Sequence, residues 1–548
     1  MFLRFLIVLV SAAAALFAQE DRAQRIDAIF QEWSKPGVPG AAVAVVQGGK
    51  LAYEKGYGIA NLEYDIPISA QTIFHVASVS KQFTAMALVL LEQDGKLSLE
   101  DDVHKYLPEL PDYGHKITIR NLLQHTSGVR DQWQTLSLAG WRMDDVITQK
   151  QILRMLFHQK ELNFPPGTRH LYSNGGYTLA AEIVAQVAKK PFPQFTDERI
   201  FRPLGMTRTH FHDDLRRIVP GRAYSYDKEK DGYEASPLNY ASVGATSLFT
   251  TAPDLAKWLD NFREPKVGGP AAIRRLQEQA VLADGKKIDY ALGVTVGAYR
   301  GLKTISHAGG DAGYRCYVLW FPELELGVAV LSNLGSFDPG SAARKVAVVF
   351  AGPKMTAETA APSRRYVAVD AGSLDQYTGY YKLDSGLLVQ IVKQNGKLMA
   401  APPGDDLLEL KPVAPGRFYV EKIGGDVEFL PESGGGMSMK VTQGGGSTEG
   451  GRVALAPADP KDMTQYPGTY WSDELETQYT ILIKDGKLVA DHVRHGEIAL
   501  TPLAKDEFKG AWFMQDVKFV RDDSGRITGM TVGGGRVTAI RFTRKQPN

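Results

Sequence analysis

The chain has 548 residues, of which 44% are hydrophobic and 23% are charged, and this balance excludes a largely disordered protein. Its 63 lysine and arginine residues nearly cancel its 62 aspartate and glutamate residues, so a formal net charge of +1 gives no electrostatic basis for binding nucleic acid or an anionic membrane. The single cysteine, Cys316, excludes an intramolecular disulfide and a cysteine-based metal cluster, and the length predicts several domains.

The first residues have the pattern of a secretory signal peptide. Arg4 precedes an apolar run over residues 5–18, which is too short for a bilayer-spanning helix and gives way to polar residues from Gln19 onward. We expect cleavage near Ala18, and therefore an exported protein, periplasmic or extracellular in a bacterium, without stable membrane insertion. The alternative is that the run forms a buried helix at the N-terminus of the mature fold.

Residues 19–352 have the pattern of one mixed α+β domain. Two helices with apolar residues at helical spacing are predicted over residues 78–93 and 176–189. Because strand-like segments lie at both ends of the domain and helices between them, the pattern favours an antiparallel sheet whose first and last strands are neighbours, flanked by helices. The predicted strands cover residues 41–46, 51–57, 292–296, 316–321 and 328–331.

The remaining residues contain an internal repeat. The segment Gln376–Tyr381 recurs 89 positions later as Gln465–Tyr470, and further matched segments follow at offsets of 89 or 90. Each copy carries an Asn-Gly or Asp-Gly hairpin turn between alternating strands and is long enough to bury its own core. We therefore expect a linker over residues 353–372 and two small antiparallel β-barrels over residues 373–456 and 457–548.

Three short motifs carry candidate chemistry, and the first is Ser78-Val79-Ser80-Lys81. Positions i and i+3 of a helix share a face, so the Lys81 amine can reach the Ser78 hydroxyl. A serine hydroxyl is a weak nucleophile that needs an adjacent base, and Lys81 would supply it. Alone the motif is weak evidence, because serine and lysine are common and the spacing arises by composition.

The second motif, Tyr172-Ser173-Asn174, falls between a Pro-Pro-Gly turn and the second predicted helix. In this position Tyr172 could exchange a proton with Lys81, and Asn174 could bind a substrate amide or carbonyl. The alternative interpretation is structural, since Ser173 or Asn174 would also serve as the N-cap of the helix.

The third motif, Ser306-His307-Ala308-Gly309-Gly310, precedes the predicted strand that contains Cys316. Paired glycines allow a substrate to approach the backbone closely, and an exposed backbone N–H there could stabilise an oxyanion. The alternative is a glycine-rich turn with a surface histidine.

A metal site is not expected. His210 and His212 lie in a run that superficially resembles a metal-binding sequence, but a further histidine and a cysteine ligand are missing. A free cysteine is commonly buried, so Cys316 is interpreted as a packing residue. We expect neither a metal nor an organic cofactor.

Together, the order and flanks of the three motifs resemble those of the serine β-lactamase and penicillin-binding protein superfamily. The resemblance is greatest to the class C β-lactamase-like branch, which also contains D-Ala-D-Ala carboxypeptidases, D-aminopeptidases and esterases. Residues 74–85 resemble its nucleophile segment, and residues 122–129 (LLQHTSGV) resemble a structural segment of the same family. The resemblance covers about residues 22–350. It implies a β-lactamase-like α/β sandwich, and the two repeats resemble the lipocalin-like barrels attached to some D-aminopeptidase-type members.

The resemblance also implies catalytic roles for the matched residues. Ser78 would be the acylated nucleophile and Lys81 its base. Tyr172 would exchange protons with Lys81 and protonate the leaving group. The backbone N–H groups of Ser78 and Gly310 would form the oxyanion hole.

Asn174, His307 and Gly309 would form the substrate-binding part of this site. Many relatives have a lysine where this chain has His307, and a neutral histidine binds a substrate carboxylate poorly. We therefore expect an exported serine hydrolase that cleaves an amide or ester of a short peptide, with D-amino acids among the candidates, or a small ester. The alternatives are a β-lactamase or D-Ala-D-Ala carboxypeptidase and, from another class, an inert protein that binds ligands through its barrels. The expected partner is a small-molecule or short-peptide substrate, and the sequence leaves the oligomeric state open.

Overall fold

The computed structural model describes residues 20–356, 366–383, 387–403, 405–443, 446–454 and 462–546. The predicted signal peptide lies outside these ranges, and so does the middle of the predicted linker, residues 357–365. The chain divides into two compact units, the first made of residues 1–136 and 142–357 and the second of residues 137–141 and 358–548. In the described ranges, every helix is too short or too polar to cross a membrane.

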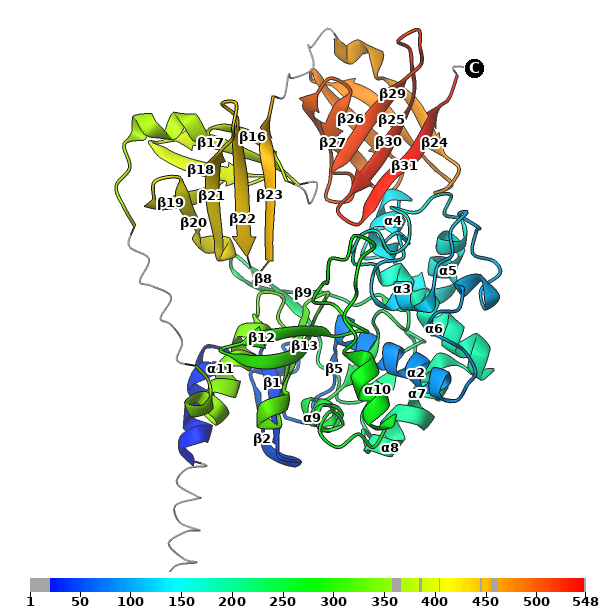
Figure 1. Cartoon of the computed structure of the whole chain (residues 1–548), viewed down its shortest axis with the longest axis vertical. Helices are drawn as coiled ribbons and strands as arrows, with labels where there is room; N and C mark the ends of the chain where they lie inside the picture. The colour runs from blue at the N-terminus through cyan, green and yellow to red at the C-terminus, as the bar shows by residue number, and fades with distance from the viewer. Residues whose placement is uncertain are drawn as a thin grey trace, which may run out of the picture. The chain divides into compact units, whose positions relative to one another are not determined.

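A six-stranded antiparallel sheet forms the centre of the first unit (Figure 1). The strand order is β12-β13-β14-β15-β1-β2, so the first strand of the chain pairs with the last strand of the unit, and the predicted sheet is confirmed. Its strands are β1 (Ala41–Gln47), β2 (Lys50–Tyr57), β12 (Thr295–Tyr299), β13 (Leu302–Asp311), β14 (Tyr314–Phe321) and β15 (Leu326–Ser332).

Helices cover both faces of this sheet. On one face, α11 (Pro339–Ala351) packs with Val43 and Val45 in a single apolar core, and on the other, α9 (Ala252–Asp260) contacts β1 and β15. Burial on two faces explains why β1 is a continuous apolar run and does not alternate with polar residues.

The chain between β2 and β12 supplies further helices and several short strands. The helices are α2 (Lys81–Gln93), α3 (Ile119–Leu123), α4 (Gln132–Leu138), α5 (Gln149–Phe157), α6 (Asn174–Ala188), α7 (Phe192–Thr196), α8 (Arg202–Leu204) and α10 (Gly269–Leu276). The strands are β3 (Ile59–Asn61), β4 (Ile66–Pro67), β5 (Phe74–His75), β6 (Ile147–Thr148), β7 (His210–Phe211), β8 (Tyr226–Glu229), β9 (Gly232–Ala235), β10 (Tyr240–Ala241) and β11 (Leu248–Thr250). The two predicted helices correspond to α2 and α6, so the chain segments that carry the first two motifs both lead into helices.

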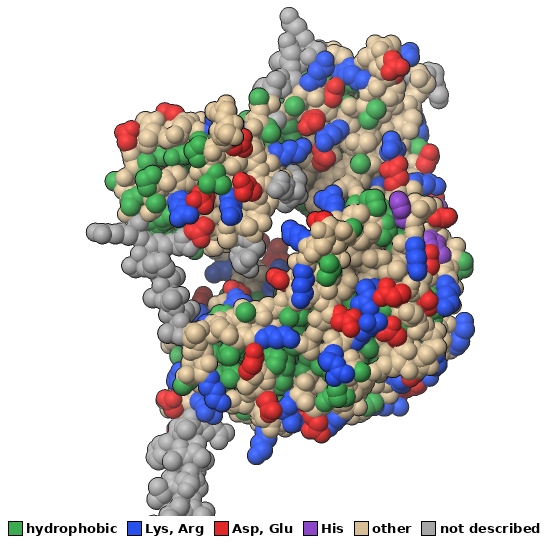
Figure 2. Space-filling model, viewed as in Figure 1, with side chains coloured by type: hydrophobic (Ala, Val, Ile, Leu, Met, Phe, Trp, Pro, Cys, Tyr) green, Lys and Arg blue, Asp and Glu red, His purple; other side chains and the backbone are tan. Residues whose placement is uncertain are grey.

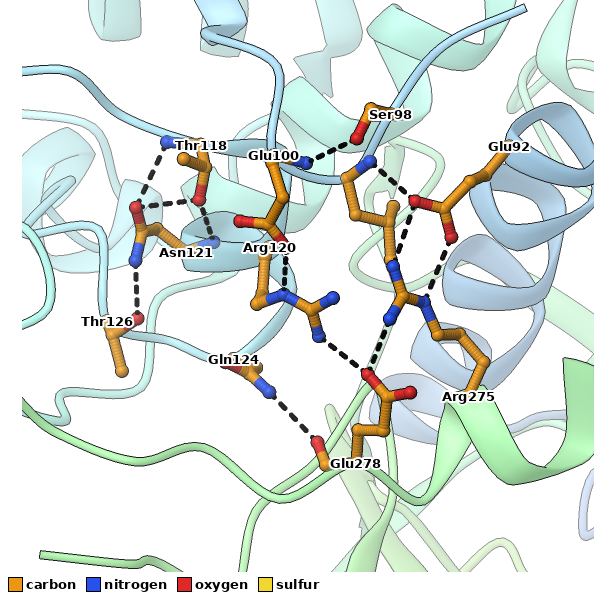
Figure 3. Close-up of polar contacts among 11 residues, drawn as sticks. Glu92, Ser98, Glu100, Thr118, Arg120, Asn121, Gln124, Thr126, Arg275 and Glu278 are labelled. Atoms are coloured by element: carbon orange, nitrogen blue, oxygen red, sulfur yellow. Dashed lines mark hydrogen bonds and ion pairs between the residues drawn. The ribbon is translucent and has the colours of Figure 1, made fainter. Parts of the chain in front are cut away.

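An ionic cluster fastens the far end of α2 to neighbouring segments (Figure 3). Arg275 on α10 donates to both carboxylate oxygens of Glu92, each at 2.9 Å, and Arg275 and Arg120 share Glu278 at 2.8 and 3.0 Å. Bidentate guanidinium–carboxylate pairs fix geometry as well as contributing energy. The cluster therefore holds in place the helix that begins with Lys81.

The third motif forms a strand, so its interpretation as a turn is wrong. Residues 306–310 belong to β13, which pairs with β12 over residues 302–306 and with β14 over residues 305–311. Glycines weaken a strand prediction because they lack a side chain to pack. At Gly309 that lack is required, since a Cβ atom there would lie 2.3 Å from the Val76 carbonyl oxygen.

Two closed eight-stranded barrels make up most of the second unit, which confirms the predicted pair of barrels (Figure 1). The first is formed by β16 (Gly379–Lys382), β17 (Leu388–Gln394), β18 (Lys397–Ala401), β19 (Leu408–Ala414), β20 (Arg417–Val420), β21 (Gly425–Pro431), β22 (Met437–Gln443) and β23 (Gly446–Val453). The second is formed by β24 (Gly468–Ser472), β25 (Thr477–Lys484), β26 (Lys487–His492), β27 (Gly496–Ala504), β28 (Glu507–Lys509), β29 (Asp516–Arg521), β30 (Ile527–Gly534) and β31 (Val537–Arg544).

The repeated turns and cores follow from the sequence. Asn395-Gly396 and Asp485-Gly486 join the second and third strands of their barrels, and all four residues have positive φ, as a two-residue hairpin turn of this type requires. An eight-stranded barrel is just wide enough for side chains to fill it. Aromatic and aliphatic side chains fill the interiors here, including Phe418 and Phe429 in the first barrel and Tyr479 and Phe519 in the second. These packed interiors weigh against the hypothesis that the barrels bind ligands in their interiors.

Charged side chains of both signs are mixed on the surface. On the face drawn in Figure 2, lysine and arginine side chains alternate with aspartate and glutamate side chains among the described residues. Several form exposed ion pairs, such as Lys484 with Glu497 at 2.7 Å, and such pairs contribute only about 0–1 kcal/mol each. The mixture of positive and negative side chains on this face therefore agrees with the near-zero net charge of the chain.

Candidate active site

Ser78 lies in a short 3₁₀ turn, η2 (Ala77–Ser80), between β5 and α2. Ala77 has a φ of 46°, in the left-handed region that residues with a side chain rarely occupy, so the backbone just before Ser78 is strained. Leu248 holds this turn from one side, because its carbonyl accepts from the Val76 N–H at 3.0 Å and its own N–H donates to Ser80 Oγ at 3.2 Å. The turn thus presents Ser78 in a fixed position at the start of α2.

Lys81 is fully buried, and its side-chain nitrogen forms hydrogen bonds with three oxygen acceptors. Its Nζ donates to Ser78 Oγ at 3.0 Å, to Asn174 Oδ1 at 2.9 Å and to the Ala245 carbonyl at 2.8 Å. Burying a charged amine without such partners would cost roughly several kcal/mol of stability. These contacts are therefore required wherever Lys81 carries its charge. The structure therefore brings together the serine, lysine and asparagine of the first two motifs.

Asp131 fixes the orientation of Asn174. The backbone N–H and the side-chain Nδ2 of Asn174 both donate to Asp131 Oδ2, at 2.9 and 2.7 Å, and Asp131 is buried. Because a carboxylate accepts and does not donate, it holds the amide nitrogen and leaves Asn174 Oδ1 facing Lys81. No sequence motif identifies Asp131, although it follows the family-like segment 122–129 by two residues.

Replacing Asp131 with asparagine is expected to reduce the kcat of ester hydrolysis. An asparagine at 131 can hold the Asn174 amide in either orientation, and losing one charge-assisted hydrogen bond of about 1.5–3 kcal/mol corresponds to roughly a 10- to 150-fold loss. Steady-state kinetics with a small ester would measure it. Asp254→Asn is the matched control, because Asp254 is also buried but binds Thr209 and Lys257 away from the motifs. Wild-type kcat in Asp131→Asn at an unchanged Tm would contradict this role.

Tyr172 lies beside Lys81 among aromatic rings. Lys81 Nζ is 4.8 Å from the centroid of the Tyr172 ring, the His125 ring packs on it at 4.1 Å, and the Tyr290 ring meets it edge-on at 6.2 Å. The neighbouring Ser173 is the N-cap of α6, since its Oγ accepts from the Gly176 N–H. The capping interpretation thus holds for Ser173, while Tyr172 and Asn174 face Lys81.

His307 is a neutral imidazole with both nitrogens engaged. Its Nδ1 lies 2.6 Å from the Ala308 carbonyl oxygen, which can only accept, so Nδ1 carries the proton. Its Nε2 therefore accepts from the Tyr290 hydroxyl at 2.9 Å. Burial, together with the charge of Lys81, lowers the pKa of His307 to about 4. The alternative of a surface histidine is wrong, because only 6% of this residue is exposed.

Strand β13 runs directly past the turn that holds Ser78. A Cβ atom on Gly309 would lie 2.3 Å from the Val76 carbonyl oxygen and 3.3 Å from the Ala77 Cβ, so any side chain would push the strand away. This close approach brings β13 against the turn η2, which contains Ser78. Two backbone N–H groups from such neighbouring segments can bind one oxyanion. That role for Ser78 and Gly310 stays a prediction.

The two candidate metal-binding histidines and Cys316 also lie in the first unit, where Cys316 is the strand partner of Gly309. His210 and His212 have ring centroids 5.7 Å apart, but in the described ranges no three potential ligands are grouped to hold a metal ion. Burial lowers the pKa of His210 to about 4. Cys316 is buried, and burial raises the pKa of its thiol well above the ordinary value, which agrees with a packing role.

The chain is similar to known proteins over most of its length. The Beta-lactamase family model matches residues 25–351. Penicillin-binding protein 4* of Bacillus subtilis (strain 168) is 27% identical over 455 residues, covering 79% of this chain and 100% of that protein. A D-aminopeptidase of Brucella anthropi is 24% identical over 531 residues, covering 93% of this chain and 96% of that protein. Among solved structures, the D-amino acid amidase from Ochrobactrum anthropi SV3 complexed with L-phenylalanine amide matches with a TM-score of 0.53 at 22% identity, covering 61% of this chain and 99% of that chain.

Proposed function

The chain belongs to the beta-lactamase family of serine hydrolases, and on that premise we propose that it hydrolyses an amide or ester through an acyl-enzyme formed on Ser78. The observation that carries the proposal is the 3.0 Å hydrogen bond between Ser78 Oγ and the buried amine of Lys81. A serine hydroxyl beside a potential base, in a strained turn, is the arrangement that nucleophilic catalysis needs.

In the proposed mechanism, Ser78 Oγ attacks the substrate carbonyl and gives its proton to the neutral form of Lys81. The N–H groups of Ser78 and Gly310 stabilise the tetrahedral oxyanion. As the intermediate collapses, the proton passes through Tyr172 to the leaving amine or alcohol. Water then attacks the acyl-enzyme by the reverse sequence, which releases the acid and restores the Ser78 hydroxyl.

We propose that the substrates are D-aminoacyl amides or esters and short peptides, met outside the cytoplasm after export. Similarity to a D-aminopeptidase extends over 93% of this chain, including the two barrels. His307 also supports this choice, because a neutral imidazole that already accepts from Tyr290 offers no cation to a substrate carboxylate. Export is supported by the apolar run over residues 5–18.

A substrate panel tests this proposal. We expect kcat/KM for D-alanine amide and for a D-alanine ester to exceed the values for a peptide ending in D-Ala-D-Ala and for nitrocefin, because only the latter two present a carboxylate that the site does not match. Preferred turnover of nitrocefin would instead identify a β-lactamase. Absence of turnover on the whole panel would favour the ligand-binding alternative.

A further inference from the structure

Asp311 is a carboxyl group close to the segment that binds Lys81, and the proposed mechanism does not use it. It is the last residue of β13, and because side chains alternate along a strand, it lies on the same face as Gly309 and His307. Its Oδ2 accepts from Thr246 Oγ1 at 3.0 Å. Thr246 directly follows Ala245, whose carbonyl binds Lys81. The Asp311 carboxyl is therefore hydrogen-bonded to the same short segment that binds the Lys81 amine.

Asp311 and His307 lie on opposite sides of the point where β13 passes Ser78. They are four residues apart, about 13 Å along a strand, with Gly309 between them. His307 binds Tyr290, whose ring meets that of Tyr172, the residue proposed to protonate the leaving group. Asp311 is consequently on the other side, where the acyl part of the substrate would lie.

Among the residues that the structure describes, no cation is in direct contact with Asp311. Within the described part of the chain it forms no ion pair, and burial raises its pKa to about 7 although Lys81 and Arg315 act in the opposite direction. The Arg315 guanidinium is occupied, because its Nη1 donates to the Ala312 and Tyr314 carbonyls at 2.8 and 2.7 Å. His75 also approaches through Thr246, but burial lowers its pKa to about 3, so it is neutral.

We propose that Asp311 binds the ammonium group at the amino terminus of the substrate, so that the site selects acyl groups with a free α-amino group. This assignment rests on the proposed function. The α-amino group is one carbon away from the carbonyl that Ser78 attacks, and Asp311 directly follows Gly310, whose N–H is proposed to bind that carbonyl oxygen. An ammonium group would supply the cation that the partly buried carboxyl lacks, and such a pair binds strongly only when both charges are present.

Two substrates that differ only in the amino group test the proposal. We would measure kcat/KM for D-alanine p-nitroanilide and for propionic acid p-nitroanilide, which lacks the ammonium group, with the wild type, Asp311→Asn and Asp254→Asn. The wild type should prefer the amino substrate. In Asp311→Asn this preference should fall by at least about 30-fold, because a neutral amide cannot balance a buried ammonium charge. Asp254→Asn should keep the wild-type ratio.

Each outcome supports or overturns the assignment. A preference that Asp311→Asn leaves intact would overturn it. If that variant does not fold, the wild type alone decides, since equal kcat/KM for the two substrates would show that the amino group is not recognised. Absence of turnover on both substrates and on small esters would instead show that the proposed function is wrong, and the assignment would fall with it.

Discussion

Replacing Ser78 with alanine is expected to abolish acylation and to lower kcat by at least about 10⁴-fold, the scale seen when a catalytic nucleophile is removed. The fold should survive, because Lys81 keeps its hydrogen bonds to Asn174 Oδ1 and the Ala245 carbonyl. Hydrolysis of a D-alanine ester, measured together with Tm, would check both statements.

Ser80→Ala is the matched control for this change. Ser80 lies in the same turn and accepts from the Leu248 N–H, but its hydroxyl has no contact with Lys81 in the described structure. Its removal should lower stability by about 1–3 kcal/mol by leaving a buried N–H unsatisfied, while acylation persists. Turnover that survives in Ser78→Ala would mean that another group performs the attack.

Replacing Lys81 with methionine is expected to lower kcat to a similar degree, again by about 10⁴-fold, because Lys81 is the base proposed to activate Ser78 Oγ, to which it is hydrogen-bonded. Methionine fills similar volume without a charge. The Asn174 Oδ1 and Ala245 carbonyl oxygens would lose their donor, so the free energy of unfolding should fall by about 1–3 kcal/mol for each buried acceptor left unsatisfied. Denaturant unfolding and ester kinetics would measure the two effects separately.

The double variant distinguishes a catalytic pair from two independent residues. If Ser78 and Lys81 act as one unit, combining Ser78→Ala with Lys81→Met should leave kcat close to that of either single variant. Losses that multiply would show that Lys81 contributes through something other than activation of Ser78.

Much of the fold follows from local patterns in the sequence. The apolar run of β1 predicts a strand buried on both faces, and the repeat with its Asn-Gly and Asp-Gly turns predicts two barrels. Strand β13 is harder to predict from the sequence, because the pair Gly309 and Gly310 is typical of a turn. The close passage of Val76 explains why position 309 of this strand requires a glycine. Predictions for the signal peptide and for residues 357–365 stay open, since both lie outside the described ranges.

The candidate site was predictable where its residues are close in sequence. Ser78 and Lys81 meet because they are three positions apart on one helical turn. The pairing of Asp131 with Asn174 joins residues 43 positions apart, and the Ala245 contact uses a backbone carbonyl that has no sequence signature. Tyr290 likewise gives no motif, although its hydroxyl donates to His307 Nε2. Tertiary contacts of this kind required the structure.

The most direct test of the central claim is intact-mass spectrometry of the purified protein after reaction with a fluorophosphonate probe, which labels activated serine residues. We predict a single adduct on the wild type and none on Ser78→Ala, with Ser80→Ala labelled like the wild type. Absence of an adduct on the folded wild type, or an adduct that persists in Ser78→Ala, would contradict the assignment of Ser78 as the activated nucleophile.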